Sequence, residues 1–269
     1  DREVVRVVTR GTVVEDSLLD QNTNNYLAAV TVEGDEAGLA FVDITTSEFC
    51  TSQIPLSHLS MELGRLAPSE ILVPMGQTSF PVQEGITLTP LESEIFHIDS
   101  ARETLLRQFS AVSLEPYGCH HLLLATRASG AILDYLDTNH KSVLSQINSL
   151  HTYSISSYMV LDTQTRRNLE LFDGGRWKSE NASLLSVLDG TKTSMGGRLL
   201  KKWIGQPLLN VQDIVRRHNS VNWFYRSTFR RGTIVGLLKS VSDIERLVNR
   251  VCNSRATPRD LVGLAKSLE

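Results

Sequence analysis

The apolar residues of this chain follow one period in its first half and another in its second. Three β-branched apolar runs, 27–32, 39–44 and 48–54, are separated by short polar or glycine-containing breaks, which is typical of an antiparallel meander. In the second half, the apolar residues recur at helical spacing. A chain of 269 residues is long enough for two domains that each bury a core. The pattern predicts an α/β domain over 1–148 and a helical domain over 149–269.

Further elements of the first half alternate between helices and strands. Apolar spacing predicts helices over 56–66 and 122–136, and a short strand over 70–73 lies between two prolines. Ser100–Glu103 has the form of a capping box and predicts the start of another helix. Residues 4–8 alternate weakly, which indicates one more strand. Strands and helices that alternate after a meander predict a mixed sheet.

The helical half contains two amphipathic helices whose faces can be assigned from the sequence. Pro207 ends the first helix, and we expect Trp203 on its buried face with the neighbouring leucines. Its polar face is expected to carry three basic residues, Arg198, Lys201 and Lys202. In the second helix, apolar residues between Val241 and Val251 form a stripe. The charged residues expected outside that stripe are Asp243, Arg246 and Arg250.

Start signals mark two other helices of this half. Ser183 predicts the N-cap of a short helix that carries three leucines. Thr257 and Pro258 suit the N-cap and the first helical position of the last predicted helix. The chain ends at Glu269 within that helix and without a closing signal, so we expect it to be a fragment of a longer protein.

The net charge of −3 hides an opposite balance in the two halves. Up to Asn148 there are 8 basic and 20 acidic side chains, which gives −12, whereas the remainder has 19 and 10, which gives +9. An acidic half is a poor surface for DNA, whereas a basic half can lie near phosphates. The alternative for the basic residues is a set of solvated faces and intramolecular ion pairs. The candidate phosphate contacts are Lys192, Arg198, Lys201, Lys202, Arg216 and Arg217.

Segments along nearly the whole chain resemble, in the same order, the MutS family of DNA mismatch-repair ATPases. The closest are DTQTRRNLEL at 162–171 and the segment 186–207, which contains TSMGGRLLKKWIGQP. The other similar segments are 5–12, 25–30, 39–49, 97–109 and 255–261. Arg10 stands where the family usually has proline. The positions that fall on family-like motifs are Gly11, Thr12, Asp43, Asp162, Arg166, Arg167, Asn168, Glu170, Gly196, Trp203 and Pro207.

This resemblance implies an RNase H-like mixed-sheet connector domain followed by the first part of a helical core domain. In the family, the connector joins the mismatch-binding domain to the core and offers a docking surface to MutL. The core carries allosteric signals towards the ATPase. The resemblance therefore implies a parent protein that binds mismatched duplex DNA, works as a homodimer, and acts near the nucleoid in the bacterial cytoplasm.

The ATP and Mg²⁺ that the resemblance implies for the parent have no recognisable site in this sequence. No GxxxxGK[ST] loop occurs, and neither Gly174-Gly175 nor Gly196-Gly197 is followed by Gly-Lys-Ser/Thr. Without such a loop no glycine-rich backbone cradles the nucleotide phosphates. The Phe-x-Glu mismatch wedge of the family is absent as well. We therefore expect these residues to bind no cofactor and to hydrolyse no ATP.

Two functions of other classes remain as alternatives. An RNase H-like fold can hold two Mg²⁺ ions on clustered carboxylates, for which Asp43, Asp99 and Asp134 are the candidates. Against this, Asp99 adjoins the predicted capping box and Asp134 suits a solvated face. The basic half could also form a helical DNA-binding module, whose affinity would fall steeply with salt.

Other residues with chemical potential have simpler structural interpretations. Adjacent side chains rarely hold one ion together, so Cys119-His120-His121 is predicted to be a loop-to-helix junction. Three scattered cysteines indicate neither a disulfide framework nor a zinc site, and fit a reducing cytoplasm. No apolar run is long enough to span a bilayer. The tryptophans are expected to be core anchors, and Arg166 and Arg167, which lie next to Glu170, could form buried or interdomain ion pairs.

Overall fold

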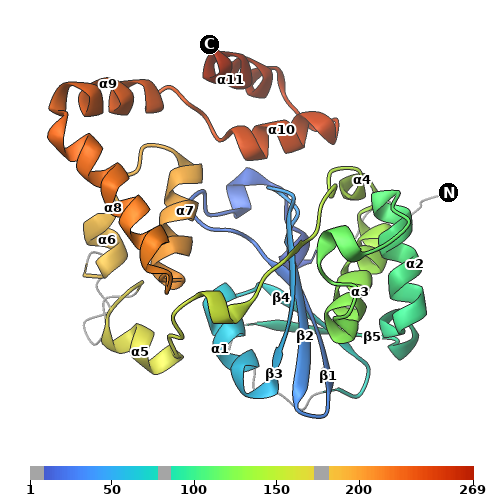
Figure 1. The fold of residues 1–269 in the computed structure, drawn as a ribbon. Helices are drawn as coiled ribbons and strands as arrows, with labels where there is room; N and C mark the ends of the chain where they lie inside the picture. The colour runs from blue at the N-terminus through green and yellow to red at the C-terminus, as the bar shows by residue number, and fades with distance from the viewer. Residues whose placement is uncertain (1–8, 78–85, 173–181) are drawn as a thin grey trace. The chain divides into compact units, whose positions relative to one another are not determined.

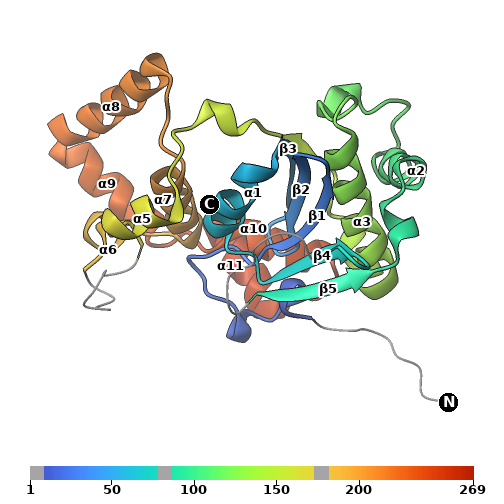
Figure 2. The same cartoon turned by 90° about the horizontal axis from the view of Figure 1, so that it is seen from below.

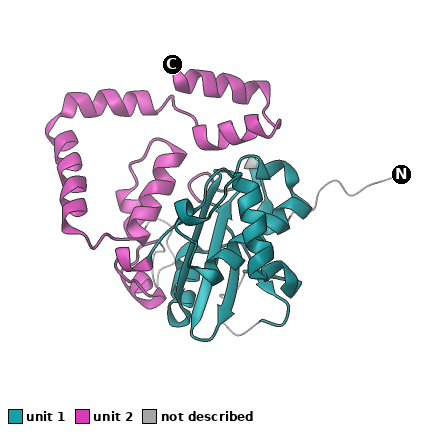
Figure 3. Ribbon diagram, turned by 45° about the vertical axis from the view of Figure 1, so that its right-hand side comes forward, with its two compact units in different colours: residues 1–20, 24–154 teal, residues 21–23, 155–269 magenta. Residues whose placement is uncertain are grey.

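The structure is a computed structural model of the 269-residue chain and describes residues 9–77, 86–172 and 182–269. It divides into two compact units (Figure 3). The α/β unit contains the chain up to Asp20 together with Asn24–Ser154, and the helical unit contains Gln21–Thr23 together with Ile155–Glu269. The division thus falls after Ser154 rather than after Asn148, and a short N-terminal segment belongs to the helical unit. The strand predicted at 4–8 lies outside the described residues.

The described part of the α/β unit is built on a six-stranded mixed sheet with the order β5-β4-β1-β2-β3-β6 (Figure 1). The strands are β1 (Leu27–Glu33), β2 (Glu36–Asp43), β3 (Glu48–Pro55), β4 (Glu70–Pro74), β5 (Thr87–Leu91) and β6 (His151–Thr152). The first three strands pair antiparallel, so the predicted meander is confirmed. Strand β4 pairs parallel with β1, β5 with β4, and β6 with β3. The predicted mixed sheet is therefore also confirmed.

Helices cover both faces of this sheet (Figures 1 and 2). The α-helices of the unit are α1 (Leu56–Leu66), α2 (Ile98–Phe109), α3 (Leu123–Asn139) and α4 (Lys141–Leu144). Short 3-10 turns are η1 (Arg10–Thr12), η2 (Asp16–Leu18), η3 (Ser93–Phe96) and η4 (Glu115–Tyr117). Helix α3 packs on β1, β2 and β3, and α2 packs on α3. A Cβ atom on Gly38 of β2 would overlap the backbone of Leu124, so glycine permits the close approach of α3 to the sheet.

The core of the α/β unit lies between the sheet and α3. Its largest fully buried side chains include Leu27, Phe49, Leu72, Leu105 and Ile132. Central strands whose two faces are both covered have continuous apolar runs rather than strict alternation, as in β1 and β2. Buried hydroxyl groups in these strands have acceptors: Thr31 donates to the Leu124 carbonyl and Thr51 to the Leu39 carbonyl, both at 3.1 Å. Burial therefore leaves these polar atoms satisfied.

One helix start in this unit differs from its prediction. The helices predicted over 56–66 and 122–136 are confirmed, but the capping box at Ser100–Glu103 is wrong. Helix α2 already begins at Ile98, and the backbone N–H of Ala101 donates to the His97 carbonyl at 2.9 Å. The preceding turn η3 positions His97 as the N-cap, so Ser100 is inside the first turn and has no free backbone donor to cap.

All but one of the described α-helices in the helical unit begin at a residue whose side chain caps the helix. Its described elements are η5 (Ile155–Ser157), α5 (Thr163–Asn168), α6 (Leu184–Leu188), α7 (Ser194–Gly205), α8 (Val211–Arg226), α9 (Thr228–Leu238), α10 (Ile244–Cys252) and α11 (Pro258–Leu268). The predicted cap Ser183 accepts from the backbone N–H of Ser186 at 3.1 Å. Thr257 caps α11 and forms a capping box with Asp260. Both predicted caps are confirmed, and α7 ends two residues before Pro207.

The faces predicted for two helices of this unit are partly wrong. Arg198 of α7 and Arg246 of α10, both expected on polar faces, are only 6% and 4% exposed. Trp203 and Trp223, expected in the core, are 42% and 49% exposed, and Trp177 lies outside the described residues. Helices α8 and α9 contain no buried residue among those described. Helical spacing identifies an apolar face, but it cannot show that an arginine will meet carboxylates contributed by another helix.

No helix among residues 9–77, 86–172 and 182–269 combines the length and the apolar character required to cross a bilayer.

Candidate functional site

The helical unit contains two buried arginines that donate hydrogen bonds to the backbone of residues 21–23. We call them and their acidic partners the arginine cluster: Arg198, Asp243, Glu245 and Arg246. Helix α7 supplies Arg198 just after Thr193, whose hydroxyl caps the helix by accepting from Gly196 N–H at 3.1 Å. The start of α10 supplies the other three residues, with Asp243 as its N-cap. Local capping therefore fixes both helices where they contribute charge.

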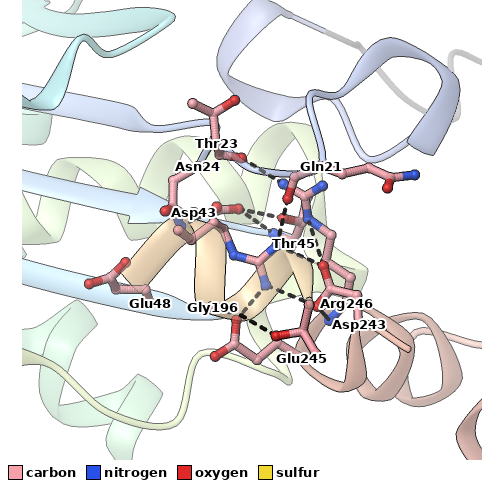
Figure 4. Close-up of polar contacts among 12 residues, drawn as sticks. Gln21, Thr23, Asn24, Asp43, Thr45, Glu48, Gly196, Asp243, Glu245 and Arg246 are labelled. Carbon is pink, nitrogen blue, oxygen red and sulfur yellow. Dashed lines mark hydrogen bonds and ion pairs between the residues drawn. The ribbon is translucent and has the colours of Figure 1, made fainter. Parts of the chain in front are cut away.

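Arg198 makes the densest set of contacts in this cluster. Its two terminal nitrogens donate to the two oxygens of Asp243, at 2.6 and 2.9 Å. Nη2 also donates to Glu245 at 2.6 Å, and Nη1 donates to the backbone carbonyl of Gln21 at 3.0 Å. A planar guanidinium suits such a forked pairing, which lysine cannot reproduce. In Figure 4, dashed lines mark the contacts of this guanidinium with the Gln21 backbone and with the side chains of Asp243 and Glu245.

Arg246 holds the same backbone segment two residues further on. Its Nη2 donates to the Thr23 carbonyl at 2.8 Å, and its backbone N–H donates to Asp243 Oδ1 at 3.3 Å (Figure 4). Between the two contacts, Asn22 lies against α7: a Cβ atom on Gly197 would come within 3.0 Å of the Asn22 side-chain oxygen. Residues 21–23 are thus fixed by two arginines and by close packing on a glycine.

The charges of the cluster reinforce one another. Burial lowers the pKa of Arg198, but the hydrogen bonds and charges of Asp243 and Glu245 outweigh burial and raise it above its ordinary value. Burial likewise raises the pKa of Asp243, yet the hydrogen bond and charge of Arg198 bring it below the ordinary value. Both groups are therefore charged at neutral pH. The arrangement stabilises a backbone position and contains no nucleophile or proton donor suited to catalysis.

The α/β unit fixes the following two residues by a different device. Asp43, fully buried at the end of β2, accepts through Oδ2 from the Asn24 side chain at 2.8 Å and from Asn25 N–H at 3.3 Å (Figure 4). Its Oδ1 accepts from the backbone and hydroxyl of Thr45, at 2.8 and 2.7 Å. Four donors thus satisfy the two oxygens of this buried side chain.

A second buried carboxylate, Glu70, holds the segment before η2. Its Oε2 accepts from Gly11 N–H at 3.0 Å, and its Oε1 accepts from the hydroxyls of Thr89 and Tyr135 at 2.6 and 3.1 Å. Thr12 closes the adjacent turn, because its hydroxyl accepts from Thr9 N–H at 2.9 Å. Gly11 and Thr12 therefore have structural roles that account for their place in the sequence motif.

Comparison with known proteins assigns both units. MutS domain II matches residues 25–148 and MutS domain III matches residues 164–269. The chain belongs to the MutS family. The DNA mismatch repair protein MutS of Dehalococcoides mccartyi is 44% identical over the whole chain, which covers 31% of that relative. The proteins of the same name from Trichormus variabilis and Synechococcus elongatus are each 40% identical over 99% of the chain, which covers 33% and 32% of them.

The chain spans about a third of the length of the curated MutS relatives that it matches. The match to MutS domain II lies within the α/β unit, which is the expected mixed-sheet connector, and the match to domain III lies within the helical unit, which is the expected core. The ordered motifs that indicated the MutS family are confirmed by these two matches.

The basic residues predicted to contact phosphate differ in their exposure and in their contacts. Lys192, Lys202 and Arg216 are exposed, and Arg216 lies 3.3 Å from Asp213 on its own helix. Arg217 lies over the Trp203 ring at 4.0 Å from its centre, a cation–π contact. Arg198 is engaged within the arginine cluster, so we leave it out of the proposed phosphate contacts. The remaining candidates are Lys192, Lys201, Lys202, Arg216 and Arg217.

The motif TRRNLE forms a capped turn of helix in the MutS core. Asp162 caps α5 by accepting from Thr165 N–H at 2.6 Å, and this backbone hydrogen bond lowers the pKa of its carboxyl. Asn168 accepts from Gln164 at 2.8 Å. Glu170 follows with a left-handed φ of 48°, and its carbonyl accepts from Leu184 N–H at 2.8 Å. The ion pairs expected for Arg166 and Arg167 stay a prediction.

The nuclease alternative has no support in the described residues. Among them, no group of three or more His, Cys, Asp or Glu side chains is arranged to hold a metal ion. Asp43 is engaged by four donors, Asp99 lies in the first turn of α2, and Asp134 lies in α3. Burial and the charge of Asp137 raise the pKa of Asp134. The Cys119-His120-His121 sequence forms the predicted loop-to-helix junction before α3.

Sequence reasoning missed the arginine cluster as a site. The helical pattern assigns Asp243 and Arg246 to a solvent-facing row, and Gln21–Thr23 lie in a polar stretch without a motif. The available signal was the N-cap position of Asp243, since a capping carboxylate is already oriented towards neighbouring donors. Nothing in the sequence indicated that this carboxylate would meet Arg198, which is 45 residues away.

Proposed function

We propose that these two domains transmit allosteric signals within a DNA mismatch-repair protein. In this proposal the parent protein binds mismatched duplex DNA as a homodimer, in the bacterial cytoplasm near the nucleoid, and the two domains link that binding to an ATPase elsewhere in the protein. The observation that carries the proposal is the match of MutS domains II and III, in order, to the two compact units. Such coupling is a free-energy linkage between distant ligand sites.

We further propose that the two domains have no catalytic activity of their own. The sequence lacks the glycine-rich loop that cradles nucleotide phosphates, so ATP and Mg²⁺ would bind in the part of the relatives that this chain does not cover. The buried carboxylates serve as hydrogen-bond acceptors for the fold, which leaves no general acid or base in a described site.

A domain exchange tests the transmitting function. The chain would replace the matching segment of Synechococcus elongatus MutS in cells that lack their own copy, and the mutation rate would be measured. We expect the rate to fall from the MutS-deficient level towards that of the unmodified strain. The control rejoins the native segment at the same two points. A chimera that accumulates and hydrolyses ATP but leaves the mutation rate at the deficient level would refute the proposal.

The connector is proposed to dock MutL through its acidic surface. The sequence up to Asn148 carries a balance of −12, and Asp99 and Glu103 lie exposed on α2. Calorimetric titration of the chain with MutL would measure binding, and the double change Asp99→Lys and Glu103→Lys should weaken it, more at low salt than at high salt. A matched reversal at Arg216, in the other unit, should leave the affinity unchanged. Equal weakening with both variants would contradict a connector surface.

The remaining basic residues of the core are proposed to bind DNA phosphates in the parent protein. Lys192 and Lys202 are exposed, and removing one basic side chain that binds a phosphate should reduce the salt dependence of DNA affinity by about one unit of slope. Lys192→Gln and Lys202→Gln in the chimeric MutS should therefore lower both affinity and slope. An unchanged slope would exclude these two side chains from the DNA surface.

A further inference from the structure

We infer that residues 21–25 form a coupling segment that transmits changes in the arginine cluster to the hydrogen bonds around Asp43. The segment is QNTNN, which begins in the helical unit and continues into the α/β unit. This inference extends the proposed function. The hydrogen bonds of the segment do not depend on that function, and only their role in transmitting a signal rests on it. Both ends of the segment are anchored by hydrogen bonds, and a single peptide bond separates the two anchors.

The first end is held by two arginines that share one carboxylate. Arg198 donates to the Gln21 carbonyl at 3.0 Å and Arg246 donates to the Thr23 carbonyl at 2.8 Å. Asp243 pairs with the Arg198 side chain and accepts from the Arg246 backbone. A displacement of α7 relative to α10 must therefore change the position of at least one of these carbonyl groups.

The other end of the segment is held by Asp43, whose two carboxylate oxygens both accept hydrogen bonds. Asn24 and Asn25 both donate to Oδ2 of Asp43, while Thr45 occupies Oδ1 with two donors. Asn25 is fixed further, since its side chain accepts from Ser69 at 2.6 Å and donates to the Arg10 carbonyl at 3.0 Å. A shift of Asn24 therefore costs hydrogen bonds at the end of β2.

The two anchors are only one residue apart along the chain. The carbonyl that Arg246 holds belongs to Thr23, and the next residue, Asn24, is already bonded to Asp43. A planar trans peptide fixes consecutive Cα atoms about 3.8 Å apart. The segment contains no glycine, so its backbone lacks the residue best able to absorb a rotation. Movement at one anchor is consequently passed to the other.

Amide hydrogen exchange on the full 269-residue chain tests the coupling without DNA, MutL or ATP. Arg198→Lys keeps the charge but removes the forked pairing. We expect it to raise the exchange rates of the Asn25 and Thr45 amides, which donate to Asp43, by about tenfold, within the usual range of coupling between sites. The amide of Ala40 in the centre of β2 should be unaffected. Arg216→Lys, an exposed arginine of α8, is the matched control and should change neither.

The reciprocal variant separates coupling from local loosening. Asp43→Asn should in turn raise exchange at the Arg246 amide, because coupling between two sites acts in both directions. A folded Arg198→Lys chain with unchanged exchange at Asn25 and Thr45 overturns the inference. So does a folded Asp43→Asn chain with unchanged exchange at Arg246.

The unmodified chain provides the measurement if a variant does not fold. The amides of Asn25 and Arg246 should then open in one event, with the same denaturant dependence, and different dependences overturn the coupling. The outcome is independent of the domain exchange. Coupled exchange with a failed chimera contradicts the proposed function alone, whereas a working chimera with uncoupled exchange contradicts this inference alone.

Discussion

The α/β unit and the helical unit bury charge by different means. In the α/β unit, Asp43 and Glu70 are fully buried and accept hydrogen bonds from amides and hydroxyls, beside a large apolar core. In the helical unit, Arg198 is buried against two carboxylates, while α8 and α9 bury no described residue. In the α/β unit, the hydrogen bonds of Asp43 and Glu70 therefore supplement a fold that apolar packing already stabilises. In the helical unit, the ion pair is a principal contact.

This difference predicts that the two units fail under different changes. Natural probes distinguish them, because all three tryptophans lie in the helical half and the buried thiols Cys50 and Cys119 lie in the α/β unit. Tryptophan fluorescence therefore follows the helical unit. Reactivity of the buried thiols follows the α/β unit, since Cys252 is exposed and reacts at once.

The largest effect is expected from Arg198→Met. Removing one partner of a buried ion pair leaves the other charge uncompensated and typically costs about 3–5 kcal/mol. Urea unfolding followed by tryptophan fluorescence should show this destabilisation in the helical unit, with little change in thiol protection. Arg216→Met, at a side chain 79% exposed, is the control and should change stability by less than about 0.5 kcal/mol. Equal effects of the two variants would remove the distinction between the units.

A core truncation should produce the opposite pattern. Leu136 is fully buried in α3 against the sheet, and Leu136→Ala should cost about 2–5 kcal/mol through the missing transfer energy and the cavity that remains. Cys50 and Cys119 should become reactive at lower urea concentration while the tryptophan transition stays in place. Leu188→Ala, a half-exposed leucine of α6, is the comparison and should cost much less. A shift of the tryptophan transition alone would contradict the assignment of this core.

The pH dependence should also differ between the units. The pKa of Asp243 is lowered by Arg198 despite burial, so its contribution is complete above its unfolded pKa of about 3.9 and is lost as pH falls through the lower folded value. Burial and then the charge of Glu48 raise the pKa of Tyr26, so its contribution is complete below about pH 10 and is lost at higher pH.

Two titrations measure these opposite limits. Tryptophan fluorescence should report opening of the helical unit in acid, and this acid transition should weaken in Asp243→Asn, which no longer titrates at that position. The part of the ionised-tyrosine absorbance that is lost in Tyr26→Phe should appear above about pH 10 only as the α/β unit opens. Early ionisation of Tyr26 in a folded chain would show that its hydroxyl is not held by Glu48, at 2.9 Å, as the structure has it.

The smallest effect is expected at the last helix. Thr257→Ala removes the cap of α11 and half of the capping box with Asp260, and should cost about 1 kcal/mol. Thr257→Ser retains the hydroxyl and is the matched control. Circular dichroism combined with tryptophan fluorescence would measure the change, and identical stabilities of the two variants would show that this cap contributes nothing.

The sequence predicted local elements well because local rules decide them. The three-strand meander, the helix at 56–66 and the caps Ser183 and Thr257 depend on residues a few positions apart, and all are confirmed. The failed capping box at Ser100 shows the limit of such rules. There, a preceding turn that the sequence did not reveal started the helix at Ile98.

By itself, the sequence determined the division into an α/β part and a helical part, and the ordered motifs that indicate MutS. Only the tertiary structure decided that Gln21–Thr23 belong to the helical unit and that Arg198 and Arg246 are buried. An arginine on an amphipathic helix is placed outside by its charge, unless carboxylates from a distant part of the chain compensate that charge. Asp243 and Glu245 compensate the charge of Arg198. This pairing between residues far apart in the sequence places an arginine of the expected polar face inside the arginine cluster.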